Sequence, residues 1–177
     1  AEHRGQRPVG VERDELAESG PAHRRGVPQS HHLHILLMRG QAIFEQLFPG
    51  LTADLEVPES GAEGVIVAMA DFIGGFAVWV DDKGSLCHTY SLLGVETYKQ
   101  VSNTTVPSGD ITVRMLFEAT EAKPGTGGHV SLFINGEQVG EGDMPRTVPV
   151  SFTSYSGLDV GRDNGLVVDR AYEDKAP

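Results

Sequence analysis

Hydrophobic residues recur at every second position along several segments after residue 50. In residues 51–57, Leu, Ala, Leu and Val alternate with Thr, Asp and Glu, and the run ends at Pro58. This alternation predicts a strand with one buried and one solvated face. In residues 130–135 the alternation ends in Asn135-Gly136, the pair favoured in a type I′ turn. The sequence therefore predicts a β-hairpin that returns over residues 137–141.

Short apolar runs predict the other strands. Residues 65–70 are continuously apolar, which is consistent with a strand covered on both faces. Residues 76–80 and 86–90 are joined by an acidic turn that ends in Gly84, so they are predicted to form a second hairpin. About nine short strands separated by turn signals are typical of an all-β, antiparallel β-sandwich. The remaining strands are predicted at 96–101, 111–118, 148–152 and 158–161.

The first 48 residues show a different pattern. They are rich in Gly, Pro, Arg and His, and they contain little sustained apolar periodicity. Residues 11–18 and 41–48 have weak amphipathic spacing, but isolated helices of this length are unstable in water. We therefore expect two parts: a low-structure N-terminal arm with short helices over residues 1–48, and a β-sandwich domain over residues 49–177.

Composition and charge limit the kinds of partner that we expect for this protein. Residues 1–40 contain six Arg and five acidic residues, whereas residues 41–177 contain eight basic and twenty acidic residues. A segment this acidic repels phosphate backbones, so nucleic acid is not expected as a partner. No apolar run reaches the length of a membrane span, and neither a membrane partner nor an intact signal peptide is predicted. The single cysteine leaves the compartment undetermined.

Two groups of residues resemble metal ligands. His31, His32 and His34 bear imidazoles suited to zinc, copper or nickel, but they lie in the arm without a scaffold, so an incidental cluster is favoured. Asp159, Asp163 and Asn164 lie in a glycine-rich turn and carry the oxygen ligands that calcium prefers. Their spacing is not that of an EF-hand loop, and side chains that bond nearby backbone amides explain the same residues. No metal site is predicted.

Two aromatic residues are candidates for sugar stacking, and one cysteine is a candidate nucleophile. Trp79 lies in a run that is apolar on both faces, so packing of Trp79 and Tyr90 in the core is favoured over a carbohydrate site. Cys87 and His88 are adjacent on a predicted strand and point to opposite faces. They are therefore rejected as a nucleophile and base pair.

No pair of carboxylates has the arrangement that glycoside hydrolysis requires. Glu12, Asp14 and Glu18 lie in the arm, and the last acid is one position too late for alternation on a strand. Asp54 and Glu56 share one face, but they are interpreted as the solvated side of an alternating strand. The sequence predicts no catalytic or cofactor-binding residue, and it leaves ligand-binding residues unknown.

Several stretches together resemble the C-terminal region of large bacterial arylsulfatases. The resemblance runs in consecutive order from about residue 51 to residue 177. It implies a lectin-like sandwich of the concanavalin A or laminin-G jelly-roll type. It also implies a final strand beyond residue 177, so the sandwich is expected to be truncated there, with marginal stability or self-association through an open sheet edge. The stretches that carry it are 61–68, 74–80, 90–96, 127–136, 139–142, 145–149 and 157–163.

The resemblance implies that this chain is part of a larger sulfatase, but the chain lacks the catalytic motif of that family. Sulfatases of this family use a formylglycine made from Cys or Ser in the pattern Cys/Ser-x-Pro-x-Arg, together with a divalent cation. Cys87 is followed by His-Thr-Tyr-Ser, and no Ser satisfies the pattern. We therefore expect a fragment of an arylsulfatase-like protein, inactive alone, whose partner is the sulfatase catalytic domain. The alternative is a free-standing carbohydrate-binding module, because one fold hosts many functions.

Overall fold

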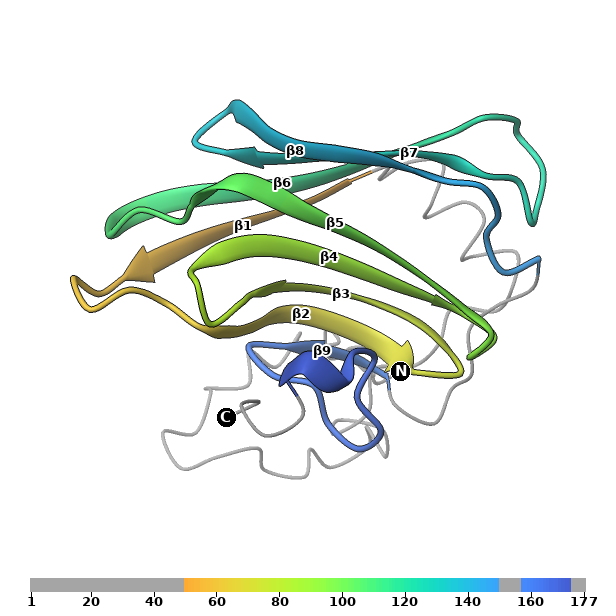
Figure 1. Ribbon diagram of the computed structural model, residues 1–177, viewed down its shortest axis with the longest axis horizontal. Helices are drawn as coiled ribbons and strands as arrows, with labels where there is room; N and C mark the ends of the chain where they lie inside the picture. The colour runs from red at the N-terminus through yellow and green to blue at the C-terminus, as the bar shows by residue number, and fades with distance from the viewer. Residues whose placement is uncertain (1–49, 150–156, 173–177) are drawn as a thin grey trace, which may run out of the picture. The chain divides into compact units, whose positions relative to one another are not determined.

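The computed structural model describes residues 50–149 and 157–172. Within these ranges it contains nine strands and one short 3-10 helix (Figure 1). The elements are β1 (Gly50–Val57), β2 (Gly64–Asp71), β3 (Gly74–Val80), β4 (Ser85–Leu92), β5 (Glu96–Thr105), β6 (Gly109–Ala119), β7 (Gly128–Ile134), β8 (Glu137–Met144), β9 (Leu158–Val160) and η1 (Arg170–Tyr172).

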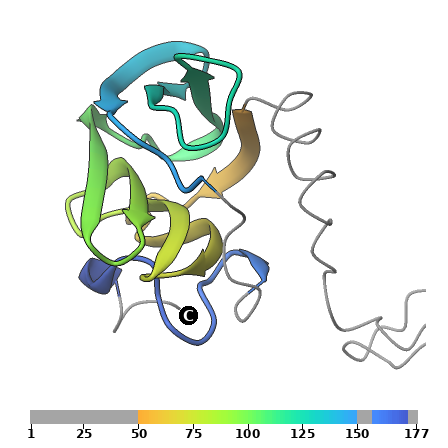
Figure 2. The same ribbon diagram turned by 90° about the vertical axis from the view of Figure 1, so that its right-hand side faces the viewer.

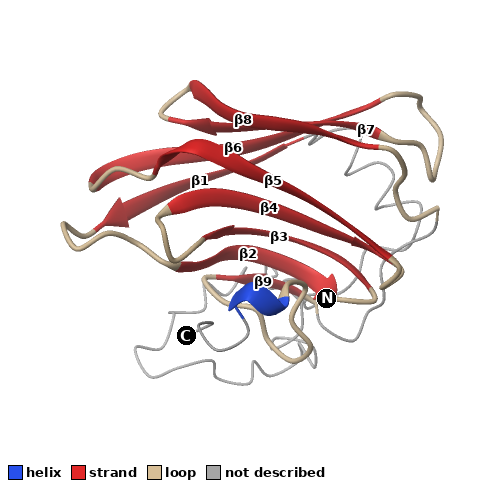
Figure 3. Ribbon diagram, viewed as in Figure 1, coloured by secondary structure: helices blue, strands red, loops and turns tan. Residues whose placement is uncertain are grey.

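The described strands form two antiparallel sheets that pack face to face. One sheet has the order β1-β6-β7-β8, and the other has the order β5-β4-β3-β2-β9. Every pair of hydrogen-bonded neighbours is antiparallel. Figure 3 shows the strands of the two layers in red, with η1 in blue beneath the five-stranded sheet. The predicted all-β, antiparallel β-sandwich is therefore confirmed.

Alternating side chains from both sheets fill the space between the layers. On β4, Leu86, Tyr90 and Leu92 join this core, while Cys87 faces the other side of the sheet. On β2, a bulge between Val65 and Val67 breaks the alternation, so Ile66 and Val67 both enter the core. The buried set is Val57, Ile66, Val67, Val78, Val80, Leu86, Tyr90, Leu92, Val106, Ile111, Val113, Met115, Val130, Leu132, Ile134, Val139 and Met144.

The outer face of the five-stranded sheet is also buried. Residues 163–172, which we call the C-terminal strap, cover it with Val167, Val168 and Tyr172. These side chains pack on Val65, Ala68, Ala77, Trp79 and Cys87. The sheet is therefore covered on both faces, and this explains why residues 65–70 and 76–80 are apolar at consecutive positions.

The β7–β8 turn has the backbone conformation that its residues predict. Asn135 and Gly136 have φ values of 52° and 83°, and they connect β7 to β8 as the sequence predicts. The prediction of a strand at 148–152 is wrong for Val148 and Pro149, the two of these residues that the structure describes. The Val148 amide donates to the hydroxyl of Tyr90 at 2.8 Å, and proline has no amide hydrogen to donate.

Other sequence predictions lie outside the described residues. These include the low-structure arm, its two short helices, the cluster of His31, His32 and His34, and the carboxylates Glu12, Asp14 and Glu18. Among the residues that the structure describes, no helix has both the length and the apolar character that crossing a bilayer requires.

Gly140 on β8 allows the edges of the two sheets to approach closely. A Cβ atom at this position would lie 3.0 Å from the carbonyl oxygen of Val101 and 3.2 Å from the Cα of Ser102 on β5. Backbone atoms yield less than flexible side chains, so Gly140→Ala is expected to lower the free energy of unfolding by about 1–3 kcal/mol. Urea denaturation measures this. Gly157→Ala is the matched control, because no atom lies within 4 Å of its added Cβ.

Candidate functional site

Trp79 and Tyr90 are core residues, as the sequence favours. Trp79 is 3% exposed, its indole nitrogen donates to the Thr89 hydroxyl at 3.0 Å, and the edge of Tyr172 packs against its ring. The Lys99 ammonium lies 4.2 Å from the centre of the Trp79 ring. Tyr90 is 7% exposed in the core between the sheets. Neither ring presents an open face on which a sugar would stack.

Cys87 and His88 face opposite sides of β4, as the alternation of side chains along a strand predicts. Cys87 lies under the C-terminal strap, where burial raises the pKa of its thiol to about 11. His88 Nδ1 donates a hydrogen bond to the Gln100 side-chain oxygen at 2.7 Å, and burial lowers the pKa of His88 to about 4. A buried, protonated thiol with His-Thr-Tyr-Ser after it does not fit a formylglycine site.

The carboxylates of Asp159 and Asp163 are held by hydrogen bonds within their own loop. Asp159 accepts bonds from the backbone and side-chain nitrogens of Asn164, both at 2.8 Å. Asp163 accepts the Val168 amide at 2.8 Å and the Tyr172 hydroxyl at 2.7 Å. Burial raises the pKa of Asp163 despite these two bonds. The carboxylates thus fix the path of the loop and the C-terminal strap.

A third carboxylate, Asp169, ties the C-terminal strap to the five-stranded sheet. It accepts the Thr89 hydroxyl at 2.8 Å and the Lys99 ammonium at 3.2 Å. Burial disfavours the charged form of Asp169, but bonds from the Ala171 amide, Thr89 and Lys99 outweigh it and lower the pKa. This contact is not visible in the sequence, because Thr89 and Asp169 are 80 positions apart.

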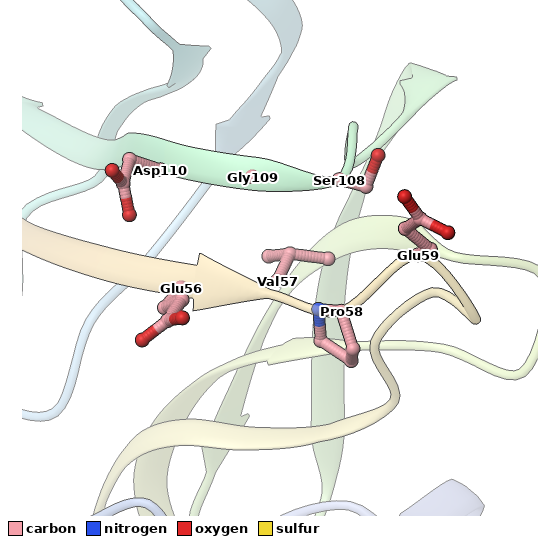
Figure 4. A pocket seen from close by; sticks show the side chains of 7 residues that line it. All are labelled: Glu56, Val57, Pro58, Glu59, Ser108, Gly109 and Asp110. Carbon is pink, nitrogen blue, oxygen red and sulfur yellow. The ribbon is translucent and has the colours of Figure 1, made fainter.

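The end of the sandwich where β1 ends and β6 begins is acidic. Its carboxylates belong to Glu56 and Asp110 on these two strands and to Glu59, Glu63, Asp81 and Asp82 in the loops beside them. A hollow of about 500 Å³ lies there between the end of β1 and the start of β6. Figure 4 shows the Glu59 carboxylate on the other side of Val57 and Pro58 from Glu56 and Asp110, so the three acids do not converge. Across the described ranges, no group of three His, Cys, Asp or Glu residues is arranged to hold a metal ion.

His129 forms an exposed polar cluster on the outer face of the four-stranded sheet. Its Nδ1 lies 2.7 Å from an Asp143 carboxylate oxygen, and its Nε2 lies 3.5 Å from Glu141. The hydrogen bond with Asp143 raises the pKa of His129, and Glu141 adds to this effect. Asp143→Asn is therefore expected to lower the pKa of His129, as measured by NMR titration of its ring protons. Asp54→Asn is a distant control, and an unchanged His129 pKa in Asp143→Asn would contradict the contact.

The opposite end of the sandwich is apolar at two adjacent turns. Ile73 lies in the β2–β3 turn, and Leu93 and Val95 lie in the β4–β5 turn. Their exposed fractions are 43%, 53% and 83%. We call this surface the apolar end, and Figure 2 views the sandwich from this side.

Direct contacts hold the two turns together. The Ser91 hydroxyl donates to the carbonyl of Phe72, and a Cβ on Gly94 would lie 3.5 Å from the same carbonyl oxygen. The Ile73 amide donates to Asp71 at 2.8 Å, which fixes the first turn. The apolar end is therefore a single candidate interaction surface. This surface is not visible in the sequence, because Ile73 and Leu93 are twenty positions apart and neither belongs to a predicted element.

Comparison with known proteins shows no family for this chain. No protein-family model matches it. The curated protein Rv3254 of Mycobacterium tuberculosis is 57% identical over 44 residues, which are 25% of this chain and 9% of that protein. Among solved structures, the native heptameric SAP-like pentraxin of Limulus polyphemus has a TM-score of 0.40 and 12% identity, and the match covers 68% of this chain and 54% of the pentraxin chain. The matched regions are therefore less than two thirds of the length of Rv3254 and of the pentraxin chain.

Proposed function

We propose that the described sandwich is the C-terminal accessory domain of an arylsulfatase-like protein, and that it supports a catalytic domain without hydrolysing sulfate esters itself. One observation supports this: the stretches that resemble arylsulfatases form the framework of the fold. Residues 61–68 contain most of β2, 74–80 are β3, 127–136 contain β7, and 157–163 contain β9. A resemblance that lies on strands and turns supports a shared structural role.

The proposal is tested with the purified chain and a bacterial arylsulfatase catalytic domain made without its own C-terminal region. The chain alone is expected to leave an aryl sulfate intact. Added to the catalytic domain, it is expected to raise that domain's melting temperature. Hydrolysis by the chain alone, or an unchanged melting temperature at saturating chain, would contradict the proposal.

Carbohydrate binding is the second candidate, and the fold permits it. The burial of Trp79 and Tyr90 speaks against this function, because the two rings considered for sugar stacking are not accessible. Reproducible binding of the chain on a glycan array would favour this function over the accessory role.

A further inference from the structure

We infer that β1 is a docking site for an extended segment of another protein, which adds a fifth strand to the four-stranded sheet. Apolar and basic side chains alternate along this segment. The apolar ones face β9, and the basic ones lie beside the acidic side chains of β1. In this mode of recognition, main-chain hydrogen bonds give affinity and alternate side chains give specificity. The docking does not depend on the proposed function, because it requires no catalytic domain.

β1 is the long sheet edge that the described part of the chain leaves open. At the other edge of the same sheet, β8 lies against β5, since a Cβ on Gly140 would approach the Val101 carbonyl oxygen to 3.0 Å. β9, at the edge of the five-stranded sheet, has three residues. β1 has eight residues, pairs with β6 in an unbroken register, and pairs with no second described strand. Without a bulge or a proline inside it, β1 is a template for a further strand.

The five-stranded sheet extends beyond β1. On β9, Val160 pairs with Val67 of β2, and Leu158 lies two residues away on the same face. Val67 belongs to the core between the sheets, so the side chains of Val160 and Leu158 also point to that side. They are nevertheless 77% and 39% exposed. Since β5 and β8 meet at one side of the sandwich, β1 and β9 lie at the other (Figure 2), and a strand added to β1 would cover these two side chains.

The inward-facing side chains of β1 are incompletely covered. Leu51, Ala53 and Leu55 pack against the core, but each is only half-buried. A fifth strand with apolar side chains on its inner face would bury their remaining exposed surface together with that of the two β9 residues. The apolar positions of the docking segment follow from this arrangement.

The outward-facing side chains of β1 include two exposed acids. Asp54 and Glu56 share this face, and Glu56 lies directly opposite Asp110 on β6, as Figure 4 shows. Like charges at paired positions destabilise a sheet, and a Lys or Arg beside them would replace repulsion with attraction. Arg114 of β6 lies over the Phe133 ring of β7, on the side away from β1. Within the described residues no basic side chain forms an ion pair with these three carboxylates, so the docking segment supplies the cations.

The same carboxylates disfavour a second copy of the chain as the occupant. Antiparallel pairing of β1 with the β1 of another copy places the two Asp54 side chains opposite or diagonal to each other. Like charges in these positions are unfavourable. The net charge of −11 adds a repulsion between copies and favours a basic partner.

The test uses the full chain and a fluorescent peptide with blocked ends, in which Val alternates with Lys over eight residues, the length of β1. Fluorescence anisotropy at about 0.15 M salt, where distant charges are screened, is expected to show saturable binding. A peptide of the same composition, with all Val before all Lys, is the control and is expected to bind at least about tenfold more weakly. Hydrogen exchange is expected to slow in residues 50–57 and to stay unchanged in β8, because the new strand bonds to the backbone of β1.

A charge reversal tests the outer face of β1. Asp54→Lys with Glu56→Lys is expected to weaken binding of the Val-Lys peptide about tenfold or more, and to permit binding of a peptide in which Glu replaces Lys. Glu121→Lys with Glu137→Lys changes the net charge by the same amount away from β1. This control is expected to bind the Val-Lys peptide as the original chain does.

A polar substitution tests the contact with β9. Val160→Asn is expected to weaken binding about threefold or more, because it removes apolar surface that the docked strand would bury. Leu166→Asn is the matched control, since Leu166 is 57% exposed and lies in the C-terminal strap, on the outer face of the sheet. Urea denaturation checks that every variant is folded.

The remaining outcomes would overturn the inference. Absence of binding, or equal binding of the alternating and control peptides, would exclude strand addition by a basic segment. Equal binding by Asp54→Lys with Glu56→Lys and by the original chain would exclude β1 as the site, and unchanged binding by Val160→Asn would exclude the contact with β9. Slower exchange in residues 50–57 with rising chain concentration alone, together with a dimer in sedimentation velocity, would identify a second copy as the occupant.

Discussion

Replacing Tyr172 with alanine is expected to lower the free energy of unfolding by about 3–5 kcal/mol. Tyr172 is 1% exposed, and its ring centre lies 5.0 Å from that of Trp79. Removing this side chain leaves a cavity between the C-terminal strap and the sheet. It also removes the hydroxyl that donates a hydrogen bond to the Asp163 carboxylate. Domains of this size have total stabilities of about 5–15 kcal/mol, so the loss is a large fraction.

The measurement is urea denaturation followed by tryptophan fluorescence, since Trp79 is the only tryptophan in the sequence. Tyr172→Phe is the matched control. It keeps the ring against Trp79 and removes only the hydroxyl, so a loss of about 1–3 kcal/mol is expected from the unsatisfied carboxylate. A change below about 1 kcal/mol in Tyr172→Ala would show that the C-terminal strap does not unfold together with the sandwich.

His88 is expected to make the sandwich lose stability in mild acid. Its folded pKa is lowered to about 4 from an ordinary value of 6.5, because burial disfavours the charged ring. The unfolded chain therefore binds a proton at this residue before the folded chain does. The contribution of His88 is fully present above pH 6.5 and decreases as the pH falls from 6.5 towards 4, by on the order of 3 kcal/mol in total.

The change is measured as the free energy of unfolding in urea at pH 7 and pH 4.5. His88→Gln keeps a side chain able to donate to Gln100 but cannot take up a proton, so its stability is expected to fall less with acid than that of the original chain. His129→Gln is the control: the raised pKa of His129 acts with the opposite sign, contributing stability at low pH that is lost as the pH rises. Equal acid sensitivity in His88→Gln and the original chain would refute the assignment.

Local sequence patterns predicted most of the described strands and several side-chain environments. The alternation in residues 130–134 and the Asn135-Gly136 turn predicted the β7–β8 hairpin because both signals depend on neighbouring residues. The apolar run around Trp79 predicted burial of that ring. The adjacency of Cys87 and His88 predicted opposite faces, since side chains alternate along a strand.

The same patterns did not predict contacts between distant segments. Val167, Val168 and Tyr172 have no strand or helix periodicity, so their role in covering the five-stranded sheet was not visible. The bond between Thr89 and Asp169 and the approach of Gly140 to Val101 join separate elements. The apolar end forms only when the β2–β3 and β4–β5 turns come together.

The amino-acid sequence by itself determined the all-β class, the hairpin turns and which strand faces are apolar. These properties follow from the conformational preferences of single residues and from a spacing of two. Only the tertiary structure decided how the strands are ordered in two sheets, which segment covers the outer face, and which end is apolar. Those features depend on pairing between residues tens of positions apart, and such pairing is selected by the packing of the whole sandwich.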